Sequence, residues 1–253
     1  MSKERLDKIL SHEGFGSRQD VKSLMHSGVV TVNGTVVTDP SSKADPDADV
    51  ISVDGEELSL RTFVYLMMNK PQNYVSANKD GLHGTVFDLL GASYHTPYLE
   101  EHMHIVGRLD VDTEGLLLFT TDGELTHVIT SPKTHRSKTY FVRLRDAVGA
   151  QLQAEYVNRC RAGIHIPPEG NEAEADCRPA ELVWHTDGKS GSSECELTIY
   201  EGKYHEVKRI FAVLGNEVVF LKRLSIGALE LDPALAPGQY RELTDEEVGR
   251  LKQ

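Results

Sequence analysis

The stretch from residue 104 to residue 123, HIVGRLDVDTEGLLLFTTDG, holds the side chains of this sequence that are best placed to do chemistry. Gly107 to Asp110 reads as a tight loop that leads into an apolar strand. A carboxylate fixed at the start of a rigid strand can act as a nucleophile or as a base. The competing interpretation is that Asp110 and Asp112 only cap a turn, which is a common role of aspartate in loops.

Positive charge is unevenly distributed along the chain. Residues 133–145 contain no carboxylate, and residues 201–223 carry five basic and three acidic side chains. Clustered basic side chains indicate contact with nucleic acid, although such side chains also solvate the edges of strands. The basic side chains of the first segment are Lys133, Arg136, Lys138, Arg143 and Arg145. A weaker group near the N-terminus consists of Arg5, Lys8, Arg18, Lys22 and His26.

The overall charge and hydropathy exclude several classes of protein. The 253 residues include 27 Lys+Arg and 39 Asp+Glu, for a formal net charge of -12. This charge excludes a protein that coats nucleic acid through bulk positive charge, but it permits a local basic site. No apolar run approaches the roughly 20 residues of a membrane span. The charged start, MSKERLDK, lacks the apolar segment of a secretory signal, so we expect a cytoplasmic protein without a membrane partner.

The three cysteines are widely spaced and form no CxxC pair. This spacing argues against a disulfide framework and against a thiolate zinc site. We expect reduced, packed thiols and no metal site. The cysteines are Cys160, Cys177 and Cys195.

Apolar periodicity divides the chain near residue 60. Residues 3–53 show two short helical patterns, then the alternating run GVVTVNGTVV with a hairpin turn at Asn33-Gly34, and a further strand in DVISVDGE. The intervening DPSSKADPDAD reads as a solvated loop. From residue 61 to residue 253, strand-like runs alternate with fewer helical windows. This pattern predicts an α+β domain with a mixed, mostly antiparallel sheet flanked by helices.

The expected elements of the second domain can be named by their sequences. The strands are FVYLMM, GLLLFTT, KTYFVRL, AELVWH, CELTIY and EVVFL, and the helical windows are 84–90, 122–130, 148–161 and 204–214. The segment IPPEGNEAEADCRP reads as an acidic surface loop between two strands.

The order of several motifs resembles the pseudouridine synthases of the RsuA type. GRLDVDTEGLLLFTTDG resembles the catalytic motif of that family, and MMNKPQNYV, SPKTHRSKTYFVRL, CELTIYEGKYHEVKRIFAVLGNEVVFLKRLSIGALEL and LAPGQYRELTDEEV follow in the family's order. RLDKIL…GSRQDVKSLMHSGVVTVNGTVV resembles the αL RNA-binding module of the ribosomal-protein-S-four type. The resemblance implies such a module over residues 1–60 and a catalytic domain over residues 61–253. One departure is Asn73, where relatives often have Gly; because Asn tolerates positive φ, we expect the turn to survive.

The resemblance implies isomerisation of uridine to pseudouridine by an aspartate nucleophile on a flipped-out base, without a cofactor. Asp110 occupies the position of that nucleophile. Lys208 is expected to pair with it, and Arg209 is the alternative because helix phase decides which of the two faces inward. Tyr140 is expected to lie against the target base, Leu221 to form an apolar floor, and Arg108 to replace the flipped base. Whether Asp110 attacks C6 or C1′, or promotes loss of the C2′ proton, stays open.

The implied partner is ribosomal RNA. EGKYHEVKRIFAVLGNEV is similar to the small-subunit form of the family, which favours a uridine-516-type site in 16S rRNA of a partly assembled small subunit. Two alternatives stay open: a 23S rRNA synthase of the same family, and a catalytically silent RNA-binding assembly factor. A monomer without a nucleotide cofactor is expected. The side chains expected to contact RNA, besides those of the pocket, are Arg136, Lys138, Arg5, Arg18 and Lys22.

Overall fold

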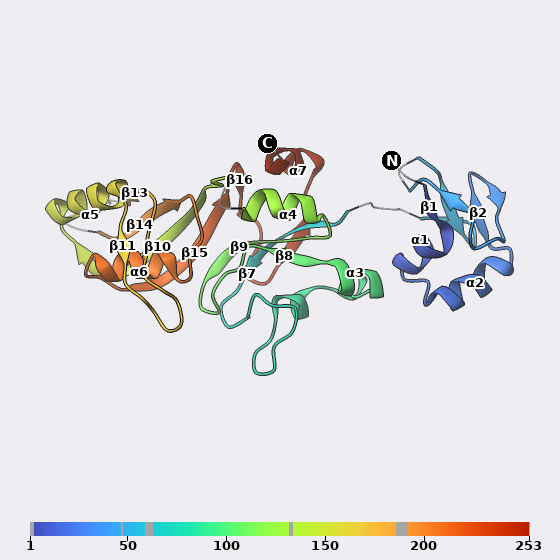
Figure 1. Cartoon of the computed structure of the whole chain (residues 1–253), viewed down its shortest axis with the longest axis horizontal. Helices are drawn as coiled ribbons and strands as arrows, with labels where there is room; N and C mark the ends of the chain where they lie inside the picture. The colour runs from blue at the N-terminus through green and yellow to red at the C-terminus, as the bar shows by residue number, and fades with distance from the viewer. Residues whose placement is uncertain (1–2, 47, 59–62, 132–133, 186–191, 253) are drawn as a thin grey trace. The chain divides into compact units, whose positions relative to one another are not determined.

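The computed structural model describes residues 3–46, 48–58, 63–131, 134–185 and 192–252 (Figure 1). Contacts group the chain into two compact units. The first contains residues 1–64, 90–104 and 120–122, and the second contains residues 65–89, 105–119 and 123–253. The expected boundary near residue 60 lies outside the described residues and stays a prediction.

The N-terminal part of the first unit contains two helices and short strands around one apolar core. The two expected helices and the turn at Asn33, where φ is 51°, are confirmed. Ser17 and Asp20 form a capping box that starts the second helix. The segment expected as a solvated loop contains a short strand whose Ala44 is fully buried, because that strand pairs with the N-terminal strand. The elements of this unit are β1 (Glu4–Arg5), α1 (Leu6–His12), α2 (Arg18–His26), β2 (Val30–Val32), β3 (Thr35–Val36), β4 (Lys43–Ala44), β5 (Ile51–Val53), β6 (Glu56–Glu57), η2 (Ala92–Tyr94) and α3 (Pro97–His102).

A mixed sheet dominates the second unit, as the sequence predicts. Its strand order is β13-β14-β10-β15-β9-β7-β17, with β16 beside β15 and β8 beside β9. The β9–β15 pair is parallel, whereas β10 pairs antiparallel with both β14 and β15. The strands are β7 (Tyr65–Lys70), β8 (His104–Val106), β9 (Glu114–Thr120), β10 (Lys138–Val148), β13 (Glu181–Trp184), β14 (Ser192–Ile199), β15 (Val218–Ile226), β16 (Leu229–Glu230) and β17 (Tyr240–Glu242). A separate hairpin consists of β11 (His165–Ile166) and β12 (Ala175–Asp176).

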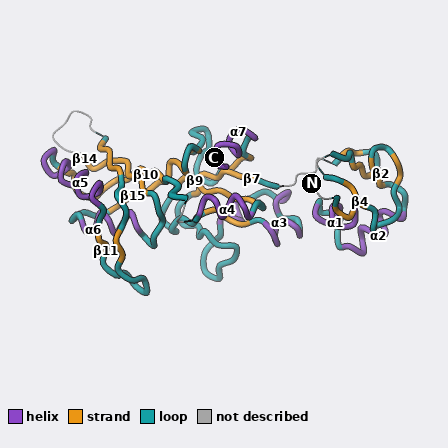
Figure 2. Tube along the Cα trace, turned by 45° about the horizontal axis from the view of Figure 1, so that its top comes forward, coloured by secondary structure: helices purple, strands orange, loops and turns teal. Residues whose placement is uncertain are grey.

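Helices cover the sheet near its two ends. Figures 1 and 2 show α5 and α6 beside the β13–β14–β10 end. Leu125 and Ile129 of α4 and Leu251 of α7 pack in one core with Leu116 and Leu118 of β9. The helices are η1 (Val86–Leu89), α4 (Gly123–Thr130), α5 (Ala150–Ala162), α6 (Glu206–Val213) and α7 (Asp245–Lys252). The four expected helical windows are thus occupied, whereas α7, β8 and β17 were not expected.

The three cysteines are free and buried. Burial raises the pKa of the Cys160 thiol to about 11 and of the Cys177 and Cys195 thiols to about 12. Protonated, packed thiols are what the sequence predicts.

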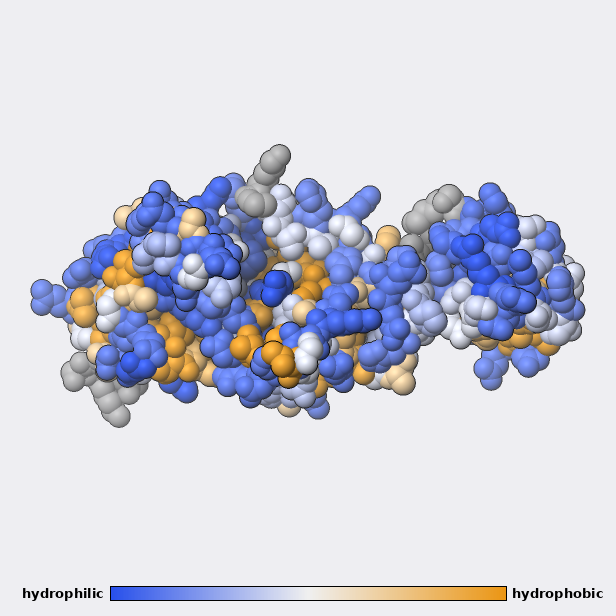
Figure 3. Space-filling model, turned by 60° about the horizontal axis from the view of Figure 1, so that its bottom comes forward, coloured by the Kyte–Doolittle hydropathy of each residue, from blue (hydrophilic) through white to orange (hydrophobic). Residues whose placement is uncertain are grey.

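Figure 3 shows one face of the molecule, on which apolar residues gather in small patches between hydrophilic ones. Among the helices of the described residues, none combines the length and apolar character that a membrane crossing needs.

Strands β9 and β15 approach each other unusually closely at Gly115. Its φ of 104° lies in the left-handed region, and a Cβ there would come within van der Waals overlap of the Arg223 backbone. Only glycine permits this approach. The close approach of the two strands places the loop that precedes β9, which carries Asp110, beside the middle of β15.

Candidate active site

Buried cations fix the backbone of the loop that carries Asp110. Lys70, at the end of β7, is fully buried, and its Nζ donates to the carbonyl oxygens of Asp110 at 2.9 Å and Thr113 at 2.8 Å. Burial lowers the pKa of Lys70 to about 8, against the opposing effect of nearby carboxylates. The Ser76 hydroxyl donates to the carbonyl oxygen of Leu109 at 2.8 Å. These contacts hold the loop carbonyls in the interior, while the Asp110 side chain lies at the pocket.

Arg223 on β15 supports the same loop from the other side. Its Nε donates to the carbonyl oxygen of Leu116 at 2.8 Å, and its terminal nitrogens lie 3.4 Å from the carbonyl oxygens of Gly107 and Arg108. The side chain is almost completely buried. Lys70 and Arg223 were not singled out from the sequence, because a cation beside an apolar run reads as a solvated strand end.

Lys208 on α6 reaches the Asp110 carboxylate. Its Nζ donates to Asp110 Oδ2 at 2.9 Å and to Asp112 Oδ1 at 2.7 Å. Burial lowers the pKa of Lys208, but the hydrogen bonds and charges of Asp112 and Asp110 outweigh burial and raise it overall. The pKa of Asp112 is lowered, because the hydrogen bond and charge of Lys208 outweigh the effect of its own burial. Both shifts favour the charged forms of Lys208 and Asp112, so a fixed ammonium lies beside the Asp110 carboxylate.

Arg209 does not reach Asp110. Its side chain is only 6% exposed, and its guanidinium donates to the carbonyl oxygens of Tyr204, Pro167 and Ala173. Adjacent helix positions point about 100° apart, so only one of Lys208 and Arg209 can face the loop. Lys208, and not the alternative Arg209, is therefore the partner of Asp110, and the Arg209 side chain supports the loop between β11 and β12. A contact of Arg209 with substrate stays a prediction.

A cavity of about 240 Å³ opens beside Asp110 and Lys208. This volume equals that of about eight liquid water molecules, which is ample for one pyrimidine ring. Tyr140 of β10, 7% exposed, and Leu221 of β15 line it, and Arg108 lies exposed at the same pocket. The structure thus brings together the expected nucleophile, cation, aromatic ring and apolar residue.

The basic strip of residues 133–145 divides between two faces of the sheet. Arg136 and Lys138 line the cavity, and their side chains also donate to the backbone carbonyls of Leu251 and Glu201. Arg143 and Arg145 are exposed on the face of β10 opposite Tyr140, where they pair with Glu194 and Glu217. Lys133 lies outside the described residues.

A pair of carboxyl groups forms part of the cavity lining. Glu206 at the start of α6 is 4% exposed, hydrogen-bonds Glu201, and accepts the backbone N–H of Lys203 at 2.8 Å. Burial and the neighbouring Glu201 raise the pKa of Glu206 to about 7. Within the described part of the chain, the Cys177 sulfur and carboxylate oxygens of Glu201 and Glu206 lie within 4.8 Å of one another. The Lys203 ammonium contacts the Glu201 carboxylate there.

Glu206 makes folding stability depend on pH. Because its pKa rises from 4.5 to about 7 on folding, its stabilising contribution is full below pH 4.5 and is lost as the pH rises through 7. Glutamine mimics the protonated acid. At pH 8 we therefore expect the free energy of unfolding of Glu206→Gln to exceed that of the native protein by about 1–3 kcal/mol. Near pH 4.5 the two proteins are expected to match. Urea unfolding at both pH values, with the exposed Glu124→Gln as control, tests this; equal stability at pH 8 contradicts it.

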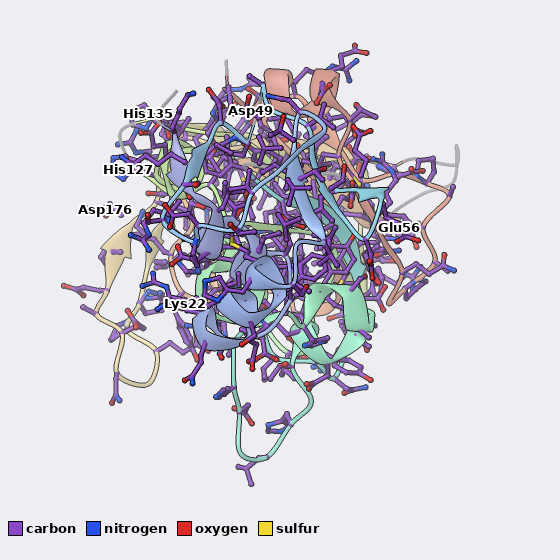
Figure 4. The ribbon with its side chains drawn as sticks, turned by 90° about the vertical axis from the view of Figure 1, so that its right-hand side faces the viewer. Lys22, Asp49, Glu56, His127, His135 and Asp176 are labelled. Atoms are coloured by element: carbon purple, nitrogen blue, oxygen red, sulfur yellow. The ribbon has the colours of Figure 1, made fainter. Side chains whose placement is uncertain are left out.

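The basic side chains of the first unit differ in whether they are free to contact RNA phosphates. The Arg5 guanidinium is held by both carboxylate oxygens of Asp7, at 3.0 and 2.8 Å. Arg18 and Lys22 are exposed on α2, and Figure 4 shows Lys22 on that helix. These two side chains are the better placed to contact phosphates.

Comparison with known proteins agrees with this geometry. Residues 64–213 match the model of the RNA pseudouridylate synthase family, and residues 4–50 match the S4 domain. An uncharacterized RNA pseudouridine synthase of Bacillus subtilis, YtzG, is 45% identical over 98% of both chains. The ribosomal small subunit pseudouridine synthase A of Escherichia coli is 39% identical over 96% of this chain and 98% of its own. A crystal structure of a pseudouridylate synthase, 38% identical, covers 98% of this chain and 99% of its own with a TM-score of 0.64.

A mixed-sheet domain with an aspartate–lysine pair at a nucleobase-sized pocket, preceded in the sequence by an RNA-binding module, defines an RNA-modifying enzyme. The chain belongs to the RNA pseudouridine synthases of the RsuA type, with an N-terminal S4 domain that binds RNA. Its reaction is the isomerisation of uridine to pseudouridine.

Proposed function

We propose that this enzyme modifies a single uridine of 16S rRNA, with Asp110 as its nucleophile. The observation that carries the assignment of Asp110 is its place at the pocket: its carboxylate is held 2.9 Å from the Lys208 ammonium beside Tyr140 and Leu221. The reaction breaks the bond from N1 to C1′, joins C5 to C1′, and moves one proton from C5 to N1. Because atoms and electrons balance within the nucleotide, the pocket has to supply only a nucleophile, proton transfer and a fixed base.

The remaining pocket residues divide these tasks. Extruding the uridine costs a few kcal/mol, least where it is already unstacked. The exposed Arg108 lies where it can take the place of the flipped base. Tyr140 offers its ring to the uracil, for which stacking contributes about 1–3 kcal/mol. Leu221 keeps the floor of the pocket apolar, which excludes water from the reacting atoms.

The choice of 16S rRNA is supported by relatives named for the small subunit. The small subunit pseudouridine synthases A of Vibrio vulnificus and Escherichia coli are 41% and 39% identical to this chain over nearly its whole length. The test is to incubate the enzyme with unmodified 16S rRNA in partly assembled small subunits, and with 23S rRNA, and to map pseudouridine by carbodiimide-dependent primer extension. One new stop in 16S rRNA supports the proposal, whereas a stop only in 23S rRNA overturns the choice of substrate and keeps the chemistry.

We expect the S4 domain to raise affinity rather than to do chemistry. Tethering it to the catalytic domain raises the effective concentration of the second RNA contact once the first has formed. Arg18 and Lys22, exposed on α2, are the side chains that we assign to phosphate contacts there.

Arg136 and Lys138 are proposed to neutralise phosphates beside the pocket. We expect Arg136→Ala or Lys138→Ala to weaken RNA binding and to reduce the slope of log K against log salt by about one. Arg143→Ala is the matched control, because Arg143 lies on the other face of β10 and pairs with Glu194. Filter binding from 50 to 300 mM salt measures the slope. If the slopes of Arg136→Ala and Arg143→Ala agree with that of the native enzyme, these side chains are ordinary solvated surface.

A further inference from the structure

His205 occupies an unusual position immediately before α6. Its backbone is left-handed, with φ 49° and ψ 27°, a region that few residues other than glycine occupy, although Asn, Asp and His enter it more often than the others. Such strained residues persist only where their surroundings hold them, and they concentrate at functional sites. The imidazole is part of the cavity lining that includes Asp110 and Lys208.

The imidazole lies between two carboxylates. His205 Nε2 is 3.7 Å from Asp110 Oδ1, and His205 Nδ1 is 3.3 Å from Glu169 Oε1. The ring also stacks on Tyr204, with 3.7 Å between centroids. The hydrogen bond to Glu169 and the stacked Tyr204 ring orient the imidazole, and Asp110 lies within ion-pair distance of its other nitrogen.

Glu169 is itself held in place by the loop between β11 and β12. The buried Arg209 donates to the carbonyl oxygens of Pro167 and Ala173, at the two ends of that loop, and lies 3.9 Å from Glu169. Glu169 and Glu172 exchange backbone hydrogen bonds across the loop. A chain of contacts therefore runs from Arg209 through the loop and Glu169 to His205 and Asp110.

Lys208 alone does not fix the Asp110 carboxylate. Its ammonium is shared with Asp112, at 2.7 Å, and contacts only Oδ2 of Asp110. A carboxylate held at one oxygen by a flexible side chain can still rotate about its Cβ–Cγ bond. His205 lies on the side of the other oxygen, Oδ1, with its Nε2 3.7 Å away, which is ion-pair distance for a protonated imidazole.

We propose that His205, oriented by Glu169, is a second positioning residue for the Asp110 carboxylate, acting on the oxygen opposite the one held by Lys208. This inference rests on the proposed role of Asp110 as nucleophile. It makes the Glu169 side chain part of the active site, although the loop that carries it is exposed and has the composition of an ordinary surface turn.

The test compares the chemical step, RNA affinity and stability in His205→Asn. Asparagine tolerates the left-handed backbone but is too short to reach Asp110, so folding is preserved while the contact is lost. With enzyme in excess over RNA, we expect pseudouridine to form about tenfold more slowly, with the Kd for RNA within about twofold of the native value and an unchanged Tm. His205→Gln, which restores an N–H donor of similar reach, is expected to recover part of the rate. His165→Asn is the matched control, since His165 on β11 pairs with Asp176 of β12 and with Glu174 just before that strand.

Glu169→Ala tests the second link. We expect Glu169→Ala to lower the rate about three- to tenfold and the neighbouring Glu172→Ala to leave it unchanged. Adding Glu169→Ala to His205→Asn is expected to cause no further loss, because the effects of coupled residues are not additive. A native rate in His205→Asn overturns the proposal, as does a slower rate matched by equal losses in RNA affinity or Tm. If the rate losses of Glu169→Ala and His205→Asn multiply in the double variant, the proposed role of Glu169 is overturned. Asp110→Asn, measured beside them, separates the two ideas: if it stays active, the proposed nucleophile is wrong, whatever His205 does.

Discussion

Asp110→Asn is expected to abolish pseudouridine formation while RNA binding is retained. Asparagine keeps the size and the hydrogen-bonding shape of the side chain but removes the negative charge and the nucleophilic oxygen. Loss of a covalent nucleophile leaves only the contribution of binding and positioning, so the single-turnover rate should fall by at least about 10⁴-fold. The Kd for RNA should stay within about threefold, because the basic and aromatic contacts are untouched. Nucleoside chromatography of the digested RNA and filter binding measure the two quantities.

Asp112→Asn provides the matched control for this change. Asp112 also accepts from Lys208, but its side chain is 62% exposed, compared with 30% for Asp110. We expect Asp112→Asn to retain at least a tenth of the native rate. If Asp112→Asn is inactive and Asp110→Asn is active, Asp112 rather than Asp110 is the nucleophile.

Lys208→Met is expected to lower the chemical rate by about 10²–10³-fold. Methionine keeps the length and apolar stem of lysine but leaves Asp110 and Asp112 facing each other without a cation. Removing one preorganised electrostatic partner from an active site typically costs this much. Single-turnover rates measured between pH 6 and pH 9 test this expectation.

Lys208→Arg separates charge from shape. It keeps the cation and should retain more activity than Lys208→Met at every pH. Equal losses in the two variants would show that an ammonium of this size, rather than positive charge, is required. A native rate in Lys208→Met would remove Lys208 from the mechanism.

The strands of the catalytic domain could be predicted because each is a run of apolar or alternating residues. FVYLMM, GLLLFTT and KTYFVRL correspond to β7, β9 and β10. The elements that escaped prediction, such as α7 (Asp245–Lys252) and β17 (Tyr240–Glu242), are short and polar. Tertiary packing determines their structure: Leu251 alone anchors α7 in the core, and β17 is held by its pairing with β7. The turn at Asn73 could be foreseen, and its φ of 69° confirms that Asn takes the left-handed conformation there.

The nucleophile and its cation could be predicted, because each is marked by one residue type within a sequence motif. The family resemblance selects Asp110 and, in HEVKRIF, favours Lys208 as its partner, with the adjacent Arg209 as the alternative because helix phase decides which of the two faces inward. Lys70 and Arg223 could not be predicted, since their function depends on complete burial against backbone carbonyls. His205 and Glu169 are 36 residues apart and meet only because Arg209 anchors the loop between β11 and β12. Contacts of this kind follow from the fold and leave no local pattern.

The most direct measurement is tritium release from 5-tritiated uridine in 16S rRNA of partly assembled small subunits and in 23S rRNA. The native enzyme and Asp110→Asn are compared side by side on both substrates. The account predicts release from 16S rRNA by the native enzyme alone, with both proteins still bound to the RNA. Equal release by Asp110→Asn would contradict the mechanism, release only from 23S rRNA would contradict the substrate, and binding without release from either would contradict both assignments.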